Sequence, residues 1–282
     1  MNKGLRSGAG LAALAILSIL AFLAVIAVNA AADIVPLNGV GTGALSDEMP
    51  NLFVPAGLTF AIWGLIYILL AGYSVNAAAE VFGKSRGGAW ETGDGILFLV
   101  NAAANIGWIF AWHWRHVTVS LCLMLVILAT LIALEERNAR RLAAGGSLVA
   151  ASPARRFFLS APINVYLGWI MVATIANVTA FLVKRGWGGL GIDPRIWTVI
   201  VIAVGAFLAA WLAWARGAVA APLVVIWAYA GIVIKRVGVD RSQSLAVWIA
   251  AIVAAVLVAV DVLLAQRSRR FSASGAASGE KP

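Results

Sequence analysis

The sequence predicts an all-α integral membrane protein with about eight transmembrane helices. Of its 282 residues, 62% are hydrophobic and only 12% are charged, whereas soluble globular domains carry about twice that charged fraction. The apolar residues gather in eight runs, each near the roughly 20 residues that a helix needs to cross a bilayer. Because every backbone amide in hydrocarbon must be bonded within its own segment, these runs should be helices and not open strands.

The predicted spans follow one another with mostly short connections. They cover residues 9–32, 54–79, 95–114, 117–134, 157–183, 196–215, 219–234 and 245–265. The first run, with basic residues before it and small residues after it, also resembles a signal peptide. Its apolar stretch is longer than the usual core of such a peptide, so we expect a retained helix, with cleavage as the alternative.

The basic residues indicate topology and not a nucleic-acid partner. The formal net charge is +9, but Lys and Arg lie at the ends of the runs and form no basic stripe with interleaved aromatics, which argues against nucleic-acid binding. With a cytoplasmic N-terminus, the cytoplasmic segments hold 14 of the 21 Lys and Arg residues and the outer segments hold 7. This asymmetry predicts a multi-pass protein with both termini in the cytoplasm, and we expect the inner membrane of a bacterium.

Few residues in the sequence suit covalent or metal chemistry. Cys122 is the only cysteine, so neither an intrachain disulfide nor a cysteine-based metal cluster is available. His113 and His116 flank a short outer turn, where an interfacial role is expected and haem ligation or contact with a tetrapyrrole carboxylate is the alternative. Without a Ser-His-Asp arrangement, a nucleotide loop or a carboxylate pair, we expect no enzymatic activity, no required cofactor and no metal site.

Asp261 is the one ionisable acid within an apolar run. It lies close to Arg267 at the cytoplasmic end of the last run. Snorkelling of the carboxylate to the interface, or pairing with an arginine, is the ordinary interpretation. A proton or substrate site is the alternative.

Aromatic and amide side chains recur at helical spacing on three of the runs. Residues three, four, seven or eight apart share one face of a helix. Such faces hold Phe60, Trp63 and Tyr67 in the second run, Asn101, Asn105, Trp108 and Trp112 in the third, and Pro162, Tyr166, Trp169, Ala173 and Asn177 in the fifth. Because amides in hydrocarbon need partners, Asn101, Asn105 and Asn177 should face other helices or a ligand. Small residues on these faces, such as Gly64 and Gly107, either permit close helix packing or leave room for a flat guest.

Interfacial belts are the alternative explanation of the aromatic residues. Trp and Tyr favour the headgroup region, which suits Trp112 because it lies near the end of its run. It suits Trp63, Trp108 and Trp169 poorly, since these lie deeper and share faces with the amides.

Three of the runs resemble the TspO/MBR family, the tryptophan-rich sensory proteins and peripheral-type benzodiazepine receptors. "PAGLTFAIWGLIYILLAG" is similar to the second helix of the family through Pro55, Phe60, Trp63, Tyr67 and Gly72, with Ala61 and Ile62 in place of the usual Gly-Pro pair. "ANIGWIFAW" resembles the third-helix signature through Asn105 and Trp108. "VYLGWIMVATIANV" resembles the fifth-helix pattern through Tyr166, Leu167, Trp169, Ala173, Thr174 and Asn177, with the proline moved to Pro162.

The resemblance covers residues 9–183 and implies both an architecture and a function. It implies a five-helix bundle at 9–183, followed by a three-helix extension at 195–266; the small, polar residues at 267–282 predict a disordered tail. A receptor- or sensor-like protein is implied, in which a porphyrin or a sterol-like rigid ligand lies in a pocket within the bundle, stacked on aromatic rings. The ligand-binding residues would be Phe60, Trp63, Tyr67, Asn105, Trp108, Trp112, Tyr166, Trp169, Ala173 and Asn177.

Two other activities and one assembly remain open. A membrane transporter of such hydrophobic compounds is the first alternative, and light- and oxygen-dependent porphyrin breakdown is the second. Besides the lipid bilayer and the hydrophobic ligand, a second copy of the chain is the remaining partner to consider, as a homodimer. The family's tryptophan at the start of the fourth helix falls near His116, so that wall of the pocket is in doubt.

Overall fold

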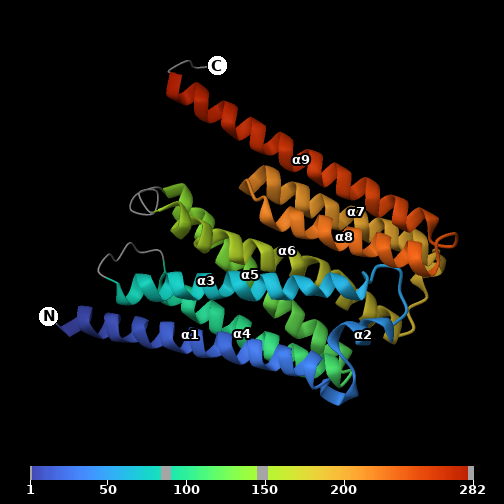
Figure 1. Cartoon of the computed structure of the whole chain (residues 1–282), viewed down its shortest axis with the longest axis horizontal. Helices are drawn as coiled ribbons and strands as arrows, with labels where there is room; N and C mark the ends of the chain where they lie inside the picture. Colours follow the sequence, from blue (N-terminus) through green and yellow to red (C-terminus); the bar gives the residue numbers. More distant parts are fainter. Residues whose placement is uncertain (1, 84–89, 145–151, 279–282) are drawn as a thin grey trace. The chain divides into compact units, whose positions relative to one another are not determined.

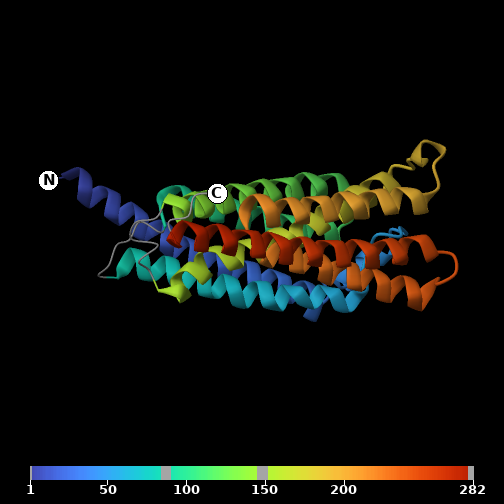
Figure 2. The same ribbon diagram turned by 90° about the horizontal axis from the view of Figure 1, so that it is seen from above.

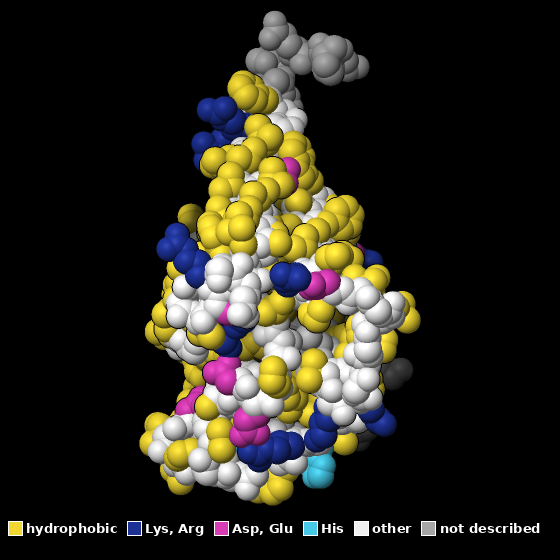
Figure 3. Space-filling model, turned by 90° about the vertical axis from the view of Figure 1, so that its right-hand side faces the viewer, with side chains coloured by type: hydrophobic (Ala, Val, Ile, Leu, Met, Phe, Trp, Pro, Cys, Tyr) yellow, Lys and Arg dark blue, Asp and Glu magenta, His cyan; other side chains and the backbone are white. Residues whose placement is uncertain are grey.

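A computed structural model describes residues 2–83, 90–144 and 152–278, and the regular elements in these ranges are all helical (Figure 1). Within the described residues, eight helices are long and apolar enough to cross a membrane. Hydrophobic side chains are spread widely over the surface seen in Figure 3, as a bilayer requires. The predicted all-α fold with eight spans is confirmed, and the chain is a multi-pass membrane protein.

The chain divides into two compact units, which are described separately. Unit 1 comprises Met1–Pro50 and Phe60–Arg185, and unit 2 comprises Asn51–Thr59 and Gly186–Pro282. The aromatic faces of the second, third and fifth predicted spans all belong to unit 1.

Five long helices of unit 1 run side by side (Figures 1 and 2). They are α1 (Asn2–Ile34), α3 (Ile62–Phe82), α4 (Thr92–His113), α5 (Val117–Ala144) and α6 (Pro153–Lys184). Helix α4 packs on α1 and α5, while α6 packs on α3 and α5. The short elements η1 (Leu37–Gly39) and α2 (Thr42–Asp47) lie between α1 and α3, and η2 (Gly57–Ala61) leads into α3. Every residue of α6 from Pro162 to Ile170 is buried, as expected of a helix that is apolar on all sides.

Pro162 lies inside α6 without breaking it. A proline lacks the N–H that would bond one turn back and loosens the preceding turn of a helix. The Asn138 side chain of α5 donates a hydrogen bond to the Leu159 carbonyl in that turn, at 2.8 Å. A neighbouring helix thus bonds a carbonyl beside the proline, which is how proline is tolerated in membrane helices.

One end of α4 is fastened to α5 by buried charges. Asp94 is fully buried, and its carboxylate accepts hydrogen bonds from Arg137 Nε at 2.6 Å and from Arg141 at 2.7 Å. Asp94 also caps α4 by accepting from the Glu91 backbone N–H at 2.7 Å, and Glu91 bonds the same two arginines. These two arginines, which the sequence analysis counted only as indicators of topology, therefore have carboxylate partners within the protein.

Unit 2 contains three long helices. They are α7 (Pro194–Trp211), α8 (Ala220–Val239) and α9 (Leu245–Ser278), with η4 (Gly189–Gly191) before α7 and the π turn η5 (Leu212–Arg216) after it. The segment Asn51–Thr59 joins this unit because Ala56 N–H donates to the Gly231 carbonyl at 3.0 Å and Trp227 Nε1 donates to the Thr59 carbonyl at 3.0 Å. A Cβ at Gly231 would lie 2.0 Å from Thr59 Oγ1, so only glycine fits this close approach.

Helix α9 continues to Ser278, whereas the sequence predicted a disordered tail from residue 267. The composition of the tail is typical of disorder, but its first proline is Pro282. Extending an existing helix costs much less free energy than starting one. Small residues without a proline therefore do not end a helix that is already formed.

Candidate ligand-binding site

Aromatic rings from α3 and α6 meet at Trp63. Its ring stacks on Tyr67 of the same helix, with centroids 5.6 Å apart, because the two residues are four positions apart. From α6, Tyr166 and Trp169 present their rings to Trp63 edge-on, at 5.6 Å and 6.4 Å. Phe60, in η2, contacts Trp169 edge-on at 5.5 Å. We call these five residues the aromatic cluster. Such separations and edge-to-face angles are those that aromatic rings prefer.

A chain of amide hydrogen bonds joins the aromatic cluster to two further helices. Asn105 of α4 donates from Nδ2 to the Tyr166 hydroxyl at 2.9 Å. Its Oδ1 accepts from Asn29 Nδ2 of α1 at 2.8 Å, and Asn29 also donates to the Val25 carbonyl. All three side chains are buried. Asn105 therefore fixes the Tyr166 ring from a third helix and faces the cluster, as the spacing predicted.

A second group of predicted residues gathers around Asn177 of α6. Its Oδ1 accepts from Ser120 Oγ of α5 at 2.7 Å and from Trp108 Nε1 of α4 at 3.5 Å. Trp108 stacks on Trp112, with centroids 6.0 Å apart, and Trp112 Nε1 donates to the Thr42 carbonyl of α2 at 3.2 Å. Trp112 is buried and bonded to protein, so it differs from an ordinary belt residue that faces the headgroups.

Two predicted positions contribute differently. Ala173 of α6 is half-buried, and its carbonyl accepts from Asn177 Nδ2 at 3.4 Å. Asn101 donates to Thr130 Oγ1 at 2.8 Å and to the Ile127 carbonyl at 3.2 Å, so it holds α4 against α5 and has its partners within the helix pair. The predicted residues thus fall into the aromatic cluster, the Asn177 group and this packing contact.

Within the described residues, the α3 side of the aromatic cluster has an unpaired hydroxyl and an exposed glycine. The Tyr67 hydroxyl is buried and has no hydrogen-bond partner within the described part of the chain. A Cβ at Gly64, which shares the α3 face of Phe60 and Tyr67, would meet no atom within 4 Å. At Gly107 a Cβ would lie 3.3 Å from Leu123 of α5. Gly107 therefore permits close packing, whereas Gly64 lies exposed at the surface of α3 with no neighbouring atom close to it.

His113, at the end of α4, holds the first loop (residues 35–50, which include η1 and α2) against that helix. This side chain is fully buried: Nδ1 lies 2.8 Å from the Leu37 carbonyl and Nε2 lies 3.1 Å from Thr42 Oγ1. Because a carbonyl only accepts, Nδ1 carries the proton and, in the neutral ring, Nε2 accepts from Thr42. Both ring nitrogens are occupied by protein, and no group of three or more metal-binding side chains exists among the described residues.

A surface ion pair fastens the same loop to the turn between α4 and α5. Arg115 Nε and a terminal nitrogen each donate to a Glu48 carboxylate oxygen at 2.7 Å. These hydrogen bonds lower the Glu48 pKa from its ordinary value, and the positive charge of Arg115 lowers it further by a smaller amount. The pair is exposed, so it contributes little stability by itself. It fixes where the loop lies.

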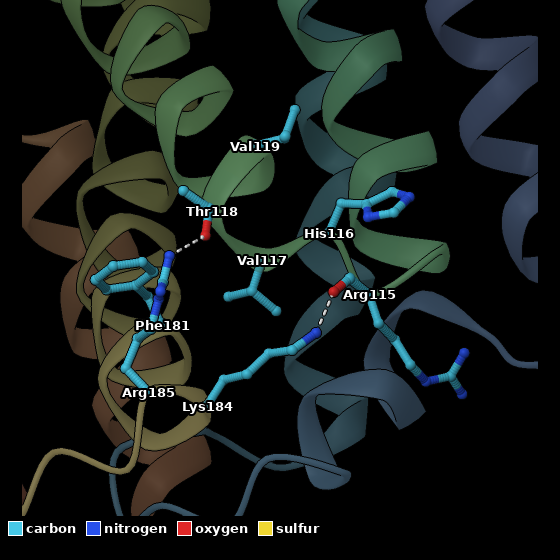
Figure 4. Close-up of a pocket in the computed structure, with 8 residues that line it drawn as sticks. All are labelled: Arg115, His116, Val117, Thr118, Val119, Phe181, Lys184 and Arg185. Atoms are coloured by element: carbon cyan, nitrogen blue, oxygen red, sulfur yellow. Dashed lines mark hydrogen bonds between the residues drawn. The ribbon is translucent and has the colours of Figure 1, made fainter.

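Next to this turn, α5 and α6 enclose a basic hollow of about 360 Å³ (Figure 4). Lys184 donates to the Arg115 carbonyl, and Arg185 donates to Thr118 Oγ1 at 3.3 Å and lies 5.3 Å from the Phe181 ring. No acidic residue lines the hollow. His116 is exposed at its rim, with its ring turned away from Arg185 in Figure 4. It therefore does not supply the missing aromatic wall.

Sequence reasoning missed three polar residues of this site. Asn29 and Ser120 are buried polar residues inside apolar runs, so the rule that selected Asn105 would have found them as well. Thr42 begins the short helix α2, between two predicted spans, where neither the periodicity nor the composition of the sequence indicates burial. Only the folded chain shows that its backbone carbonyl and hydroxyl meet Trp112 and His113.

The sequence matches the family model described as TSPO-like protein over residues 15–264. The match extends past residue 183, where the resemblance in the motifs ended, and includes the helices of unit 2. No curated protein and no solved structure matched the chain. Because the match covers most of the sequence, the chain belongs to the TSPO-like protein family.

Proposed function

We propose that this protein is a receptor- or sensor-like membrane protein that binds a rigid, flat hydrophobic ligand of the tetrapyrrole class beside the aromatic cluster of unit 1. One observation carries the proposal: Trp63 of α3 contacts Tyr67, Tyr166 and Trp169 at 5.6–6.4 Å. Rings held at these distances give a flat guest stacking surfaces on two helices.

The accessibility of the α3 side of the cluster supports this proposal. Phe60, Trp63 and Tyr67 are half-buried, while Tyr166 and Trp169 are buried. A ligand would therefore contact the α3 rings first and lie against the exposed surface at Gly64. The Tyr67 hydroxyl could bond the ligand, and such a bond would remove the free-energy cost of leaving this buried group unpaired.

The basic hollow is an argument for a ligand that carries carboxylate groups at its edge. Asn177, Phe181 and Lys184 lie four and seven residues apart, so they share one face of α6. The hollow thus continues the face of the Asn177 group. Lys184 and Arg185 there have neutral oxygen partners and no carboxylate among the lining residues. Porphyrin carboxylates would gain charge-assisted hydrogen bonds from them.

The test compares two tryptophan truncations in detergent, with protoporphyrin binding followed by quenching of protein fluorescence. Trp169→Ala removes the ring that contacts both Phe60 and Trp63 and should weaken binding at least tenfold, as expected for the loss of about 1.4 kcal/mol or more of stacking and burial. Trp248→Ala, in unit 2, removes an indole that bonds the Arg241 carbonyl and is the matched control. Equal affinities of the two variants would reject the assignment.

The same preparation separates binding from the other activities. A binding protein retains porphyrin without moving or consuming it. Net porphyrin flux into proteoliposomes that Trp169→Ala abolishes would instead establish a transporter. Loss of porphyrin absorbance under light and oxygen, dependent on the protein, would establish an enzyme.

We further propose that both termini face the cytoplasm, in a bacterial inner membrane. The support is the excess of Lys and Arg in the segments that would then be cytoplasmic. Reporter fusions after Pro282 and within the 35–50 loop test this orientation. A periplasm-active reporter should work only in the loop.

We also propose that two copies of the chain could form a homodimer, and crosslinking in the membrane tests this assembly.

A further inference from the structure

Unit 2 contains a groove between α7 and α9 that ends at an acid. The groove has a volume of about 420 Å³ and is apolar except for Asp261. Five alanines leave this volume open where larger residues would fill it: Ala203, Ala206, Ala210, Ala250 and Ala254. Phe207 and Leu257 line the groove and are 69% and 57% exposed, so it opens sideways towards lipid.

Asp261 has a neutral hydrogen-bond donor as its partner within the described residues. Its Oδ1 accepts from Trp214 Nε1 at 3.0 Å, and no ion pair involves Asp261 in that part of the chain. The arginine on its own helix that reaches this region, Arg269, donates to the Trp214 carbonyl at 2.8 Å. Among the residues that the structure describes, Asp261 is therefore not paired with an arginine, which was one of the ordinary interpretations of the sequence.

An irregular turn brings Trp214 to Asp261. Residues Leu212–Arg216 form the π turn η5, and Ala218 N–H donates to the Leu212 carbonyl at 3.2 Å across it. A π turn holds one extra residue and so changes which face the following side chains occupy; such turns are frequent at functional sites. Gly217 ends it at φ +68°, and a Cβ there would lie 2.8 Å from the Arg269 guanidinium. Gln266 donates to the Gly217 carbonyl at 3.1 Å, so α9 holds the turn in place.

We propose that this groove binds a cationic amphiphile, with its ammonium group at Asp261 and its apolar body between α7 and α9. A carboxylate in a membrane span is costly without a charged partner, and its attraction for a cation grows as the surrounding dielectric constant falls. The Trp214 indole beside the carboxylate adds a face on which a cation binds favourably. The alanine-lined volume accepts the hydrocarbon part of the ligand. This site lies in unit 2 and does not depend on the function proposed for unit 1.

The first experiment uses two dansyl probes that differ in charge. One ends a hexyl chain in a primary ammonium and the other ends it in a hydroxyl, and binding to the full-length protein in neutral-lipid nanodiscs is followed by energy transfer from tryptophan. Asp261→Asn should raise the Kd of the ammonium probe about tenfold or more and leave that of the alcohol unchanged. Asp193→Asn is the matched control, since Asp193 lies outside the groove and pairs with Arg195. An equal effect of Asp261→Asn on both probes would overturn the proposal.

A second experiment leaves the protein unaltered. A hydrophobic carbodiimide modifies carboxyl groups that lie in lipid, and peptide mass spectrometry locates the label. The ammonium probe should slow labelling of Asp261 several-fold, whereas the alcohol should not. Ala206→Phe, which fills the groove, should weaken both probes alike. If neither probe slows labelling, or both slow it equally, the groove holds ordinary lipid and the proposal fails.

Discussion

Asn105 and Tyr166 are joined by a 2.9 Å hydrogen bond in the centre of unit 1. Because Asn105 also accepts from Asn29, its replacement leaves the Tyr166 hydroxyl without this donor and removes one of the two hydrogen bonds of Asn29, which keeps its bond to the Val25 carbonyl. Removing the Tyr166 hydroxyl breaks one hydrogen bond only. Each buried group that loses its partner costs about 1–3 kcal/mol. Asn105→Ala should therefore lower the free energy of unfolding by about 2–5 kcal/mol, and Tyr166→Phe by roughly half as much. Unfolding in mixed SDS and maltoside micelles measures both, and an equal loss for the two variants would show that the Asn29 link has no energetic weight.

Two glycines of α3 differ in their surroundings, because Gly72 is tightly packed and Gly64 has no close neighbour. A Cβ at Gly72 would lie 2.2 Å from the Phe158 ring of α6, whereas a Cβ at Gly64 meets nothing within 4 Å. Gly72→Ala should destabilise the protein by about 1–3 kcal/mol because Phe158 must move. Gly64→Ala should be neutral or stabilising by up to about 1 kcal/mol, since alanine has the higher helix propensity. Thermal unfolding of the two variants checks the order.

The larger substitution Gly64→Leu extends that test to function. It places a larger side chain on the exposed surface beside the aromatic cluster and should weaken porphyrin binding with little change in the unfolding temperature. Unchanged affinity would mean that the ligand does not use this side of α3.

Asp94 should be the most sensitive charged position of unit 1. It is fully buried and bonded to Arg137 and Arg141, and breaking a buried pair costs about 3–5 kcal/mol because charges are left without partners. Asp94→Ala should cost that much in the free energy of unfolding. The matched control is Arg140→Ala, which breaks the exposed Arg140–Glu136 pair and should cost less than about 1 kcal/mol. Similar losses would contradict this account.

Periodicity identified the helices and most of the interior faces, because membrane spans must satisfy their own backbone and bury their amides. The spacing placed Trp63, Asn105, Tyr166 and Trp169 on interior faces of their helices, and the structure shows which of these faces meet. Local spacing carries no information about which loop folds back on which helix. The contacts of Thr42 with Trp112 and His113 join residues 70 and 71 positions apart, and only the packed chain shows them.

The sequence also could not predict that acids at the ends of apolar runs are buried. Asp94 and Glu80 lie just outside the runs as drawn, where charged residues are normally solvated. The structure buries both carboxylates and pairs them with Arg137, Arg141 and Arg155. Hydropathy cannot distinguish an exposed charge at a helix end from one that is covered by arginines from neighbouring helices.

The contact between the first loop and the α4–α5 turn, made by Glu48 and Arg115, should weaken in acid. The Arg115 guanidinium lowers the Glu48 pKa from its ordinary 4.5 by hydrogen bonding to the carboxylate. A depressed pKa in the folded state means that the pair stabilises the loop fully above pH 4.5 and loses this contribution as the pH falls through the folded value. Carbon-detected NMR of the Glu48 carboxyl should give a titration midpoint below 4.5, moving towards 4.5 in Arg115→Gln and in about 1 M salt, which screens exposed charges. Arg185→Gln, which removes a neighbouring cation bonded to Thr118, should leave the midpoint unchanged; a midpoint at 4.5 in the unaltered protein would show that the ion pair does not form in solution.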